Sequence, residues 1–441
     1  ITRRHGRAVL AALQNRLGFA QIEAGVLDQP AVAAHAVVGD NLRGADTNRV
    51  PVITLLRHYG GNHAYNSETE SEGIHHLGNI VSGYIRRLVS LDAFRGATIA
   101  AMILVNNPGD GATTFAPLHH AKWHGWTFTD MVFPFFLWMV GIAMTFSYAR
   151  RVEQGADKGK LLLHTLRRAA MIFALGLLLN GFPKYDLTTI RIPGVLQRIA
   201  LCYLIGSCIF LYTKWRGQVA AIVAVCTVYW MLMTLVPVPG YGPGVLEPVG
   251  NFGQWIDQMM LSGHMYSRTK VWDPEGLVST LPAIANVLFG ALTGTLLRKD
   301  YIAEEEKSSW ILFSGAVLAF LGTILDQFMP INKQLWTPSF AVFTSGMAAL
   351  SFGCFYWLID VCGYKRGTKW LTIYGMNAIA IYALSGLFAR LLNMSGMRPS
   401  IYAVFSGALP PYLASLGFAL MNVGVLYLVA WTMYRRGWFL R

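Results

Sequence analysis

Charged residues are scarce in this chain of 441 residues, since only 13% of them are Asp, Glu, Lys or Arg. A globular protein has about 25%, and a water-facing surface for a chain of this length cannot be made from half of that share. Hydrophobic residues make up 54%, and long apolar stretches recur from about residue 96 onward. The composition therefore excludes a soluble protein and predicts an all-α, polytopic integral membrane helical bundle.

Acidic residues and cysteines are also few. There are 23 Asp and Glu against 36 Lys and Arg, which gives a net charge of +13. The basic residues gather in short loops between apolar stretches, so we exclude nucleic acid as a partner and expect contact with membrane lipid. The five cysteines include no C-x-x-C pair, so we interpret them as packing residues and not as disulfides, redox centres or zinc ligands.

The first 85 residues differ from the rest of the chain. They contain six of the eleven histidines and no apolar run of 18 residues. His58, His63, His75 and His76 lack the regular spacing of zinc ligands, so no metal is predicted. We interpret residues 1–85 as a polar segment that is disordered or results from an overlong gene start, and residues 86–441 as a membrane domain.

Ten apolar stretches are long enough to cross a bilayer as helices. They are residues 92–107, 129–149, 168–182, 195–213, 217–236, 277–297, 309–329, 338–359, 370–390 and 412–434. A shorter stretch, 401–409, ends at two prolines and is predicted to be a re-entrant or interfacial helix.

The loops between these stretches alternate between rich and poor in Lys and Arg. The poor loops are 107–128, 182–194, 237–276, 330–337 and 391–411. By the positive-inside rule the poor loops face outward and both termini are cytoplasmic, which agrees with an even number of spans.

The first outward loop follows Asn106 and contains His119, His120 and His124 within six residues. A neutral imidazole here can abstract a proton or attack an acyl group near neutral pH. A metal site is less favoured, because the loop has no carboxylate or cysteine at ligand spacing. An interfacial belt of aromatic and histidine side chains explains the same residues.

Two arginines lie inside predicted spans, close to the first residue of each. Arg198 falls inside the fourth span, where it needs an anion or a carbonyl, and both an ion pair with Asp130 or Asp326 and a substrate contact fit. Arg95 lies at the cytoplasmic mouth of the first span, where it either holds a phosphate or snorkels toward the lipid headgroups.

Two further outward loops have side chains that suit a sugar. Asp273 and Glu275 precede the sixth span, and Asn332, Lys333 and Trp336 precede the eighth. Carboxylates and amides bind hydroxyls, and an indole stacks on a sugar ring. Helix capping also explains them, and Asp273 followed by proline is predicted to be an N-cap with Pro at the first helical position. Within the ninth span, Asn377 needs an interhelical partner.

Taken in order, these segments resemble the heparan-α-glucosaminide N-acetyltransferase family over about residues 88–441. The matching segments are Ser-Leu-Asp-Ala-Phe-Arg-Gly at 90–96, Val-Asn at 105–106, His-Ala-Lys-Trp-His-Gly-Trp-Thr at 120–127 followed by Asp130 and by Val-Phe-Pro at 132–134, Arg-Ile-Pro-Gly-Val-Leu-Gln-Arg at 191–198, Asp-Pro-Glu-Gly at 273–276, and Asn332, Lys333 and Trp336. The resemblance implies a transmembrane acyltransferase that moves acetyl from cytoplasmic acetyl-CoA to the amine of a terminal glucosamine on the far side of the membrane.

The resemblance also implies roles for single residues. The family's active histidine matches His120, which is followed by Ala-x-Trp-x-Gly-x-Thr, and its neighbouring asparagine matches Asn106. We expect substrate contacts from Arg198, Asp273, Glu275, Asn332, Lys333 and Trp336, and contacts with CoA from Arg95 and Arg191. No lumenal glycosylated domain like that of lysosomal animal members precedes the first span, so we expect a relative in a bacterial inner membrane.

An alternative function is a transporter for N-acetylglucosamine or a related amino sugar, because several bacterial relatives have been regarded as possible sugar transporters. Internal repeats are the usual sign of a transporter, and the two halves of this chain show no convincing similarity to each other. The sequence leaves the oligomeric state open, with a homodimer as one possibility.

Overall fold

Helices are the only extended regular elements in residues 88–439, the part of the chain that the computed structural model describes. In lipid every backbone N–H and C=O group must be bonded within the protein, and a helix achieves this within one segment. The prediction of an all-α bundle is thus confirmed. The predictions made for residues 1–85, including the four histidines, lie outside the described residues.

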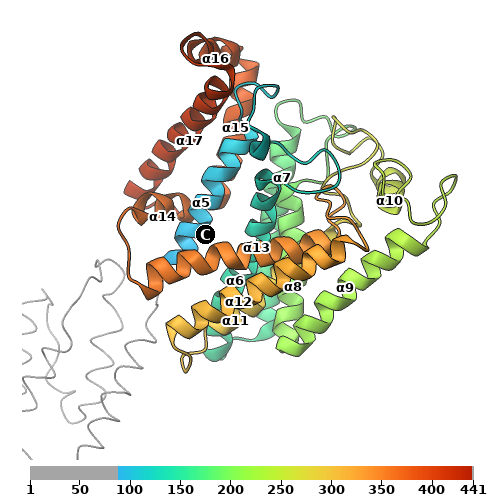
Figure 1. Cartoon of the computed structure of the whole chain (residues 1–441), viewed down its shortest axis with the longest axis vertical. Helices are drawn as coiled ribbons and strands as arrows, with labels where there is room; N and C mark the ends of the chain where they lie inside the picture. Colours follow the sequence, from blue (N-terminus) through green and yellow to red (C-terminus); the bar gives the residue numbers. More distant parts are fainter. Residues whose placement is uncertain (1–87, 440–441) are drawn as a thin grey trace, which may run out of the picture. The chain divides into compact units, whose positions relative to one another are not determined.

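Nine helices in this described range are long and apolar enough to cross a membrane. They are α5 (Val89–Asn106), α6 (Phe128–Glu153), α7 (Lys158–Gly181), α8 (Val195–Tyr212), α9 (Trp215–Leu235), α11 (Thr280–Leu297), α12 (Glu304–Asp326), α13 (Pro338–Tyr356) and α17 (Pro411–Arg435). A short π-helix, η3 (Trp357–Val361), continues α13. Each of the nine overlaps one of the ten predicted spans (Figure 1).

The predicted ninth span, residues 370–390, is broken rather than straight. It consists of α14 (Thr368–Met376) and α15 (Ala378–Met394), which bend by 81° at Asn377. The backbone of Asn377 is not helical, and its side chain donates to the Trp438 carbonyl at 3.0 Å. The pair counts as a tenth span if it crosses as one unit. The predicted short helix near 401–409 is α16 (Met397–Ala408).

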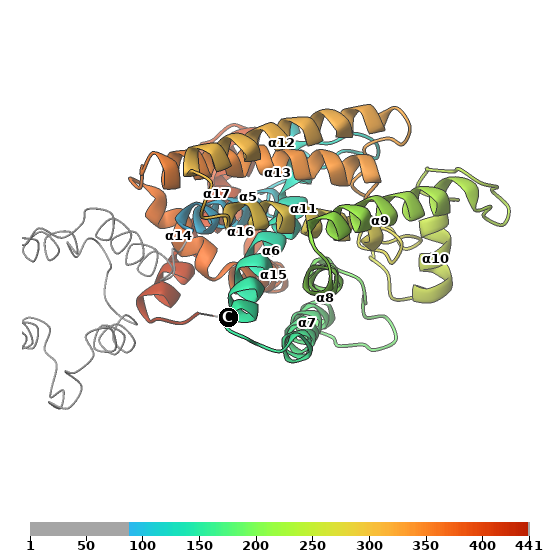
Figure 2. The same ribbon diagram turned by 90° about the horizontal axis from the view of Figure 1, so that it is seen from below.

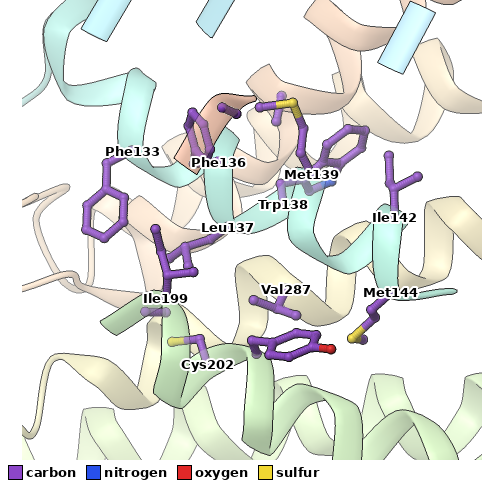
Figure 3. Packing of buried hydrophobic residues seen from close by; sticks show 14 of the residues in the cluster. Phe133, Phe136, Leu137, Trp138, Met139, Ile142, Met144, Ile199, Cys202 and Val287 are labelled. Carbon is purple, nitrogen blue, oxygen red and sulfur yellow. The ribbon is translucent and has the colours of Figure 1, made fainter. Parts of the chain in front are cut away.

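The core is formed mainly where α6 meets α8 and α11. Figure 3 shows Phe136, Leu137 and Trp138 of α6 together with Ile199 of α8 and Val287 of α11. The contact between α6 and α11 is close because both helices have glycine there. A Cβ atom added to Gly141 of α6 would lie 1.9 Å from the Val287 carbonyl oxygen. Figure 2 shows α12 and α13 side by side in one part of the bundle and α7 and α8 in another.

The loops that follow α5, α7, α9 and α12 meet at one end of the bundle, and we call residues 107–127, 182–194, 236–279 and 327–337 the loop layer. Backbone hydrogen bonds connect them, from Gly125 to Ile331 at 2.7 Å and from Ile192 to His264 at 2.9 Å. The third loop contains α10 (Phe252–Leu261), which the sequence did not predict. Its N-cap is Asn251, whose side chain accepts from the Gln254 N–H.

Candidate functional site

His120 is held by a carboxylate at the start of α6. Its Nδ1 lies 2.7 Å from Oδ1 of Asp130. The Asp130 side chain is 1% exposed, whereas that of His120 is 46% exposed. Asp130 forms a capping box with Thr127, and its Oδ2 accepts from the backbone N–H groups of Thr127 and Ala121, both at 3.0 Å. The capping box that begins α6 therefore also directs the buried Asp130 carboxylate toward His120.

Lys333 completes this cluster from a distant loop. Its Nζ lies 3.0 Å from Nδ1 of His120 and 3.3 Å from Oδ1 of Asp130. The hydrogen bond from the Gly125 N–H to the Ile331 carbonyl joins the two loops. Gly125 has a φ of 93°, which residues other than glycine rarely adopt. Burial lowers the pKa of Lys333, and the negative charges of Asp130 and Glu275 oppose that shift.

The tautomer of His120 depends on whether its Nδ1 donates to Asp130 or accepts from Lys333. A lysine ammonium only donates and a carboxylate only accepts, so Nδ1 carries its proton when it binds Asp130. In that state the lone pair is on Nε2, and the side chain as a whole is 46% exposed. The other two histidines of the loop differ, because His119 contacts the Thr114 carbonyl at 3.0 Å and His124 contacts the Asn332 amide at 3.3 Å. Within residues 88–439 only His120 of the three is paired with a carboxylate.

Arg191 lies in the loop layer together with the carboxylates that were predicted to bind substrate. It donates to both oxygens of Asp273, at 2.8 and 2.5 Å, and to Glu275 at 2.5 Å. Its guanidinium also lies 4.6 Å from the centre of the Tyr266 ring. Although burial favours the neutral form, the two carboxylates raise the pKa of Arg191 above its ordinary value. Its charge is therefore balanced within this cluster.

The prediction that Asp273 is an N-cap with Pro274 at the first helical position is wrong. The helix α11 begins at Thr280, with Ser279 as its N-cap. Asp273 instead lies in a turn, where it accepts from the Glu275 N–H at 2.9 Å in addition to Arg191. Its carboxylate orders the loop before the helix rather than the helix itself.

Arg198 is a buried cation, 1% exposed, in the first turn of α8. Its Nη2 donates to the Gly276 carbonyl at 3.2 Å and to the Ser279 hydroxyl. The guanidinium also lies 4.8 Å from the centre of the Trp336 ring. Its Nε and Nη1 have no hydrogen-bond partner among the described residues.

The ion pair proposed for Arg198 with Asp130 or Asp326 is absent from the described residues. Asp130 binds His120 and Lys333, and Asp326 accepts from the Ile331 N–H at 2.6 Å. A carbonyl, a hydroxyl and an indole face hold the buried charge instead, which is a polar arrangement that lipid-buried cations require.

Asn332 and Trp336 are buried, at 0% and 1% exposed. Trp336 has a φ of 53°, and its indole N–H donates to the Asn286 side chain at 2.9 Å. The Asn332 side chain accepts from the Leu335 N–H at 2.9 Å. These contacts hold the loop that contains Lys333, and the Trp336 ring packs against Arg198 rather than facing an open space.

Asn106 lies apart from His120. It is exposed at the end of α5 and lines an open hollow of about 180 Å³ between α5, α7, α8 and α15, together with Asn180, Gln197 and Arg390. No hydrogen bond joins Asn106 to His120 in the described part of the chain. The structure thus pairs His120 with Asp130, and the sequence held a signal for this in the Thr127-x-x-Asp130 spacing of a capping box.

Arg95 lies near the other end of α5. Its Nη1 donates to Asp92 at 3.1 Å and lies 3.5 Å from the Gly375 carbonyl oxygen. Arg95 precedes Asn106 by eleven residues, which is about 16 Å along a helix. It is therefore far from the loop layer. Residues 88–439 contain no group of three His, Cys, Asp or Glu side chains arranged to hold a metal.

Known proteins resemble much of this chain in sequence. A model of the catalytic part of heparan-alpha-glucosaminide N-acetyltransferase matches residues 87–326, more than half of the chain. The human heparan-alpha-glucosaminide N-acetyltransferase is 28% identical in an alignment 354 residues long, which covers 67% of this chain and 52% of the human protein. The mouse protein of the same name is 28% identical in an alignment 352 residues long, which covers 67% of this chain and 53% of the mouse protein.

The chain spans about half the length of these curated relatives. The family match includes His120 and Asp130 and extends through Arg191, Arg198 and Asp273. It thus covers the described cluster except for the loop of Lys333. The chain belongs to the heparan-alpha-glucosaminide N-acetyltransferase family.

Proposed function

We propose that this protein is a transmembrane N-acetyltransferase that moves acetyl from acetyl-CoA to the amine of a glucosamine-type sugar. The observation that carries the proposal is the hydrogen bond of 2.7 Å between His120 and the buried Asp130. It orients an imidazole whose side chain is 46% exposed, so the ring can meet a substrate, as an acyl-transfer site requires. The names of the human and mouse relatives state an N-acetyltransferase that acts on a glucosaminide.

In the direct route, Nε2 of His120 removes a proton from the sugar amine while the amine nitrogen attacks the thioester carbonyl carbon. The new N–C bond forms, the C–S bond breaks, and the thiolate leaves with the bonding electron pair and takes the proton from Nε2. In the covalent route, Nε2 attacks first and carries the acetyl group until the amine displaces it. Both routes use the same atom, and Asp130 stabilises the positive imidazole in both.

The acceptor contacts in this proposal come from the loop layer. Glu275 is 12% exposed and Lys333 15% exposed, so both can meet a sugar hydroxyl. Asp273 and Arg191 hold Glu275 in place through their ion pairs. Arg198, Asn332 and Trp336 support the same loops from beneath, and we assign them a positioning role because of their burial.

The donor contacts come from the opposite end. Arg95 is 22% exposed and is the residue that we propose for a phosphate of CoA. We propose Asn106, at the loop-layer end of the same helix, as the hydrogen-bond donor to the thioester carbonyl oxygen, a role that requires the bound thioester to bring the space beside Asn106 and His120 together. The carbonyl becomes negatively charged during attack, and an amide N–H stabilises that charge.

The proposed sidedness follows from the basic loops, with both termini in the cytoplasm of a bacterial inner membrane and the loop layer outside. This requires α14 and α15 to cross as one span. Lys122→Cys and Lys333→Cys in an otherwise cysteine-free protein should react with an impermeant thiol reagent added to intact cells. Reaction only after the cytoplasmic side is opened would reverse the orientation and, with it, the direction of transfer.

The activity itself is tested with purified protein, labelled acetyl-CoA and a set of glucosamine acceptors. We expect an N-acetylated sugar and one free CoA thiol for each transfer. The same protein is placed in vesicles without acetyl-CoA and offered labelled N-acetylglucosamine. Uptake there, with no acetylated product in the first assay, would support the transporter in place of the transferase.

A further inference from the structure

The hollow beside Asn106 has room for a small polar group. It holds about 180 Å³, slightly more than a protein cavity that accepts benzene. Its lining comes from α5 and α15, which contact each other, and from α7 and α8, which form a second contacting pair (Figure 1). The acetyl thioester end of CoA therefore fits in it.

Four carboxamide side chains line this hollow, those of Asn106, Asn107, Asn180 and Gln197. Two of them are already engaged within the protein. Nδ2 of Asn107 donates to the Ile103 carbonyl at 2.8 Å, and Nδ2 of Asn180 donates to two backbone carbonyls at 2.9 and 3.0 Å. The amides of Asn106 and Gln197 donate to no described residue. Two N–H donors thus remain for a ligand.

Gln197 is the buried one of these two donors. Its side chain is 3% exposed, and its Nε2 has no hydrogen-bond partner among the described residues. Proteins keep few buried N–H groups without a partner, because each of them has lost its hydrogen bonds to water. A ligand oxygen in the hollow would supply the missing bond.

Two glycines leave space for the Gln197 amide. A Cβ atom added to Gly176 of α7 would lie 2.4 Å from its Oε1, and one added to Gly194 would lie 2.7 Å from the same atom. A side chain at either position would push the amide away. The close packing against both glycines therefore fixes the amide at the wall of the hollow.

The hollow also lies at the start of α8. Val195, Leu196 and Gln197 are the first three residues of this helix, and all three line the hollow. The backbone N–H groups of a first turn have no partner within the helix and form the positive end of its dipole. The N-cap is Gly194, which has no side chain to bind them.

The charge of the lining has one sign. Arg390 is the single charged residue among the described residues that line the hollow, and no Asp or Glu is among them. Together with the start of α8, it favours an oxygen that carries negative charge.

The remaining lining is largely apolar and includes Leu179, Leu196 and Ala389. A fully charged phosphate would lose water against these side chains. An acetyl group has a methyl for the apolar wall and a carbonyl oxygen for the amides. The hollow therefore matches a group that becomes negative only during the reaction.

We propose that Gln197, beside Asn106, donates a second hydrogen bond to the acetyl carbonyl oxygen of the donor. The inference rests on the proposed acetyl transfer and adds a residue that contacts the reacting group. When the attacking nitrogen bonds to the carbonyl carbon, the electron pair of the C=O π bond moves onto the oxygen, where both amides stabilise it. The pair returns as the C–S bond breaks and the thiolate leaves with the bonding electrons. His120 lies in the loop that follows Asn106, so the attack requires this loop to close over the hollow.

Gln197→Met tests the role in turnover, because methionine keeps the length of the side chain and has no N–H donor. We expect kcat to fall about 100-fold, the scale of one lost donor to such an oxygen. The KM for acetyl-CoA should change far less, since the bond strengthens as charge develops. The matched control is Gln218→Met in α9, another glutamine that is 3% exposed and has an unpartnered amide atom but does not line the hollow. Its kcat should stay close to that of the wild type.

A pair of ligands tests whether Gln197 contacts the carbonyl itself. Ethyl-CoA has a CH₂ group in place of the C=O group of acetyl-CoA. In calorimetric titrations without an acceptor, the wild-type protein should bind acetyl-CoA about two- to tenfold more tightly than ethyl-CoA, the scale of one net hydrogen bond. Gln197→Met should remove this difference and leave the binding of ethyl-CoA unchanged.

Three results would overturn the inference. The first is a kcat of Gln197→Met equal to that of the wild type. The second is equal weakening of acetyl-CoA and ethyl-CoA binding by Gln197→Met, which is the result of a merely structural role. The third is an equal loss of kcat in Gln218→Met, with thermal unfolding showing that both variants are folded.

The titrations separate this inference from the proposed function. A preference for acetyl-CoA over ethyl-CoA that depends on Gln197, in a protein that acetylates no acceptor, would keep the carbonyl contact and refute the transferase. Transfer that continues at the wild-type rate in Gln197→Met would refute the carbonyl contact and keep the transferase.

Discussion

The two ends of the bundle organise their charges differently. In the loop layer, His120 and Lys333 are 213 residues apart in the chain and 3.0 Å apart in space. At the opposite end, Arg95 pairs with Asp92 within one turn of the same helix. Contacts between distant loops hold a charge at one position relative to several helices, whereas a pair within one turn shields the charge locally. Arg95 also approaches a distant segment, at the Gly375 carbonyl, but only at 3.5 Å.

Under the proposed function, this difference assigns the chemistry to the loop layer and the binding of the donor's charge to the opposite end. A reacting group must be held within about 0.5 Å of its productive position, and Asp130 is held by two backbone N–H groups as well as by its partners. A binding site for a phosphate needs only an available cation, and Arg95 remains 22% exposed beside Asp92. Substitutions in the loop layer should therefore change turnover, and those at the basic end should change the affinity for the donor.

The largest effect is expected from His120→Ala. Removal of a general base costs about 10²–10⁴-fold in rate, and removal of a covalent nucleophile costs more. Transfer should be lost while acetyl-CoA still binds, as measured by product formation and by calorimetry on the same preparation. His119→Ala and His124→Ala should stay within about tenfold of the wild type, because neither ring contacts a carboxylate of the described residues. Full transfer by His120→Ala would end the acyltransferase mechanism, and a block of sugar uptake without acetyl-CoA would favour transport.

Asp130→Asn should come next, with turnover lowered about 100-fold or more. The amide keeps the size of the side chain but no longer stabilises a positive imidazole or selects the Nδ1–H tautomer. The change should appear in kcat far more than in the KM of the acceptor. Asp186→Asn, an exposed acid of the same loop layer, serves as the control and should be close to wild type. Equal losses in both variants would mean that Asp130 only supports the fold, and thermal unfolding of each variant checks this.

The helices of this protein could be predicted from its sequence because lipid imposes a simple rule of length and polarity. The bend at Asn377 could not, because mean hydropathy over a window is unchanged by a break at one residue. The sign of the bend in the sequence was the polar asparagine inside an apolar span. In the structure its side chain donates a hydrogen bond to the Trp438 carbonyl. The helix α10 was missed because its ten residues are too few for a span and lie in a long loop.

The candidate site was predicted in part. His120 was identified by resemblance to a family motif, and Lys333 was predicted to lie in an outward loop. No local sequence pattern indicates that these two residues are in contact. Their contact depends on the backbone pairing of Gly125 with Ile331, which is a property of the tertiary fold. Arg198 illustrates the same limit, because an ion pair was expected and the fold supplied a carbonyl, a hydroxyl and an indole.

At the basic end, Arg95→Ala should raise the KM for acetyl-CoA several-fold and leave kcat nearly unchanged. A phosphate contact acts equally in the ground state and the transition state, so its loss weakens binding without slowing the chemical step. The control is Arg298→Ala, which removes another arginine of this end that is paired with Glu153 at 2.5 Å. An unchanged KM for Arg95→Ala would assign this residue to its contacts within the protein, such as those with Asp92 and Gly375, and not to CoA. Equal rises in both variants would indicate a diffuse electrostatic attraction instead of one contact.

The smallest effect concerns stability, through Asp257. Burial raises its folded pKa from an ordinary value near 3.8 to about 6, so between these values the folded state holds a proton that the unfolded state has lost. The free energy of unfolding therefore falls as pH rises through this window. One pKa unit corresponds to about 1.4 kcal/mol. Asp257→Asn cannot titrate, so its Tm should exceed that of the wild type by a few degrees near pH 7.5 and match it near pH 4.

The control is Asp186→Asn, for which the expected pH dependence has the opposite sign. Hydrogen bonds from Thr188 lower the pKa of Asp186, so any stability that the Asp186 carboxylate contributes is present at neutral pH and is lost as pH falls. Thermal unfolding in detergent across this range measures both variants. A difference between Asp257→Asn and the wild type that stayed constant with pH would show that Asp257 does not titrate in this range.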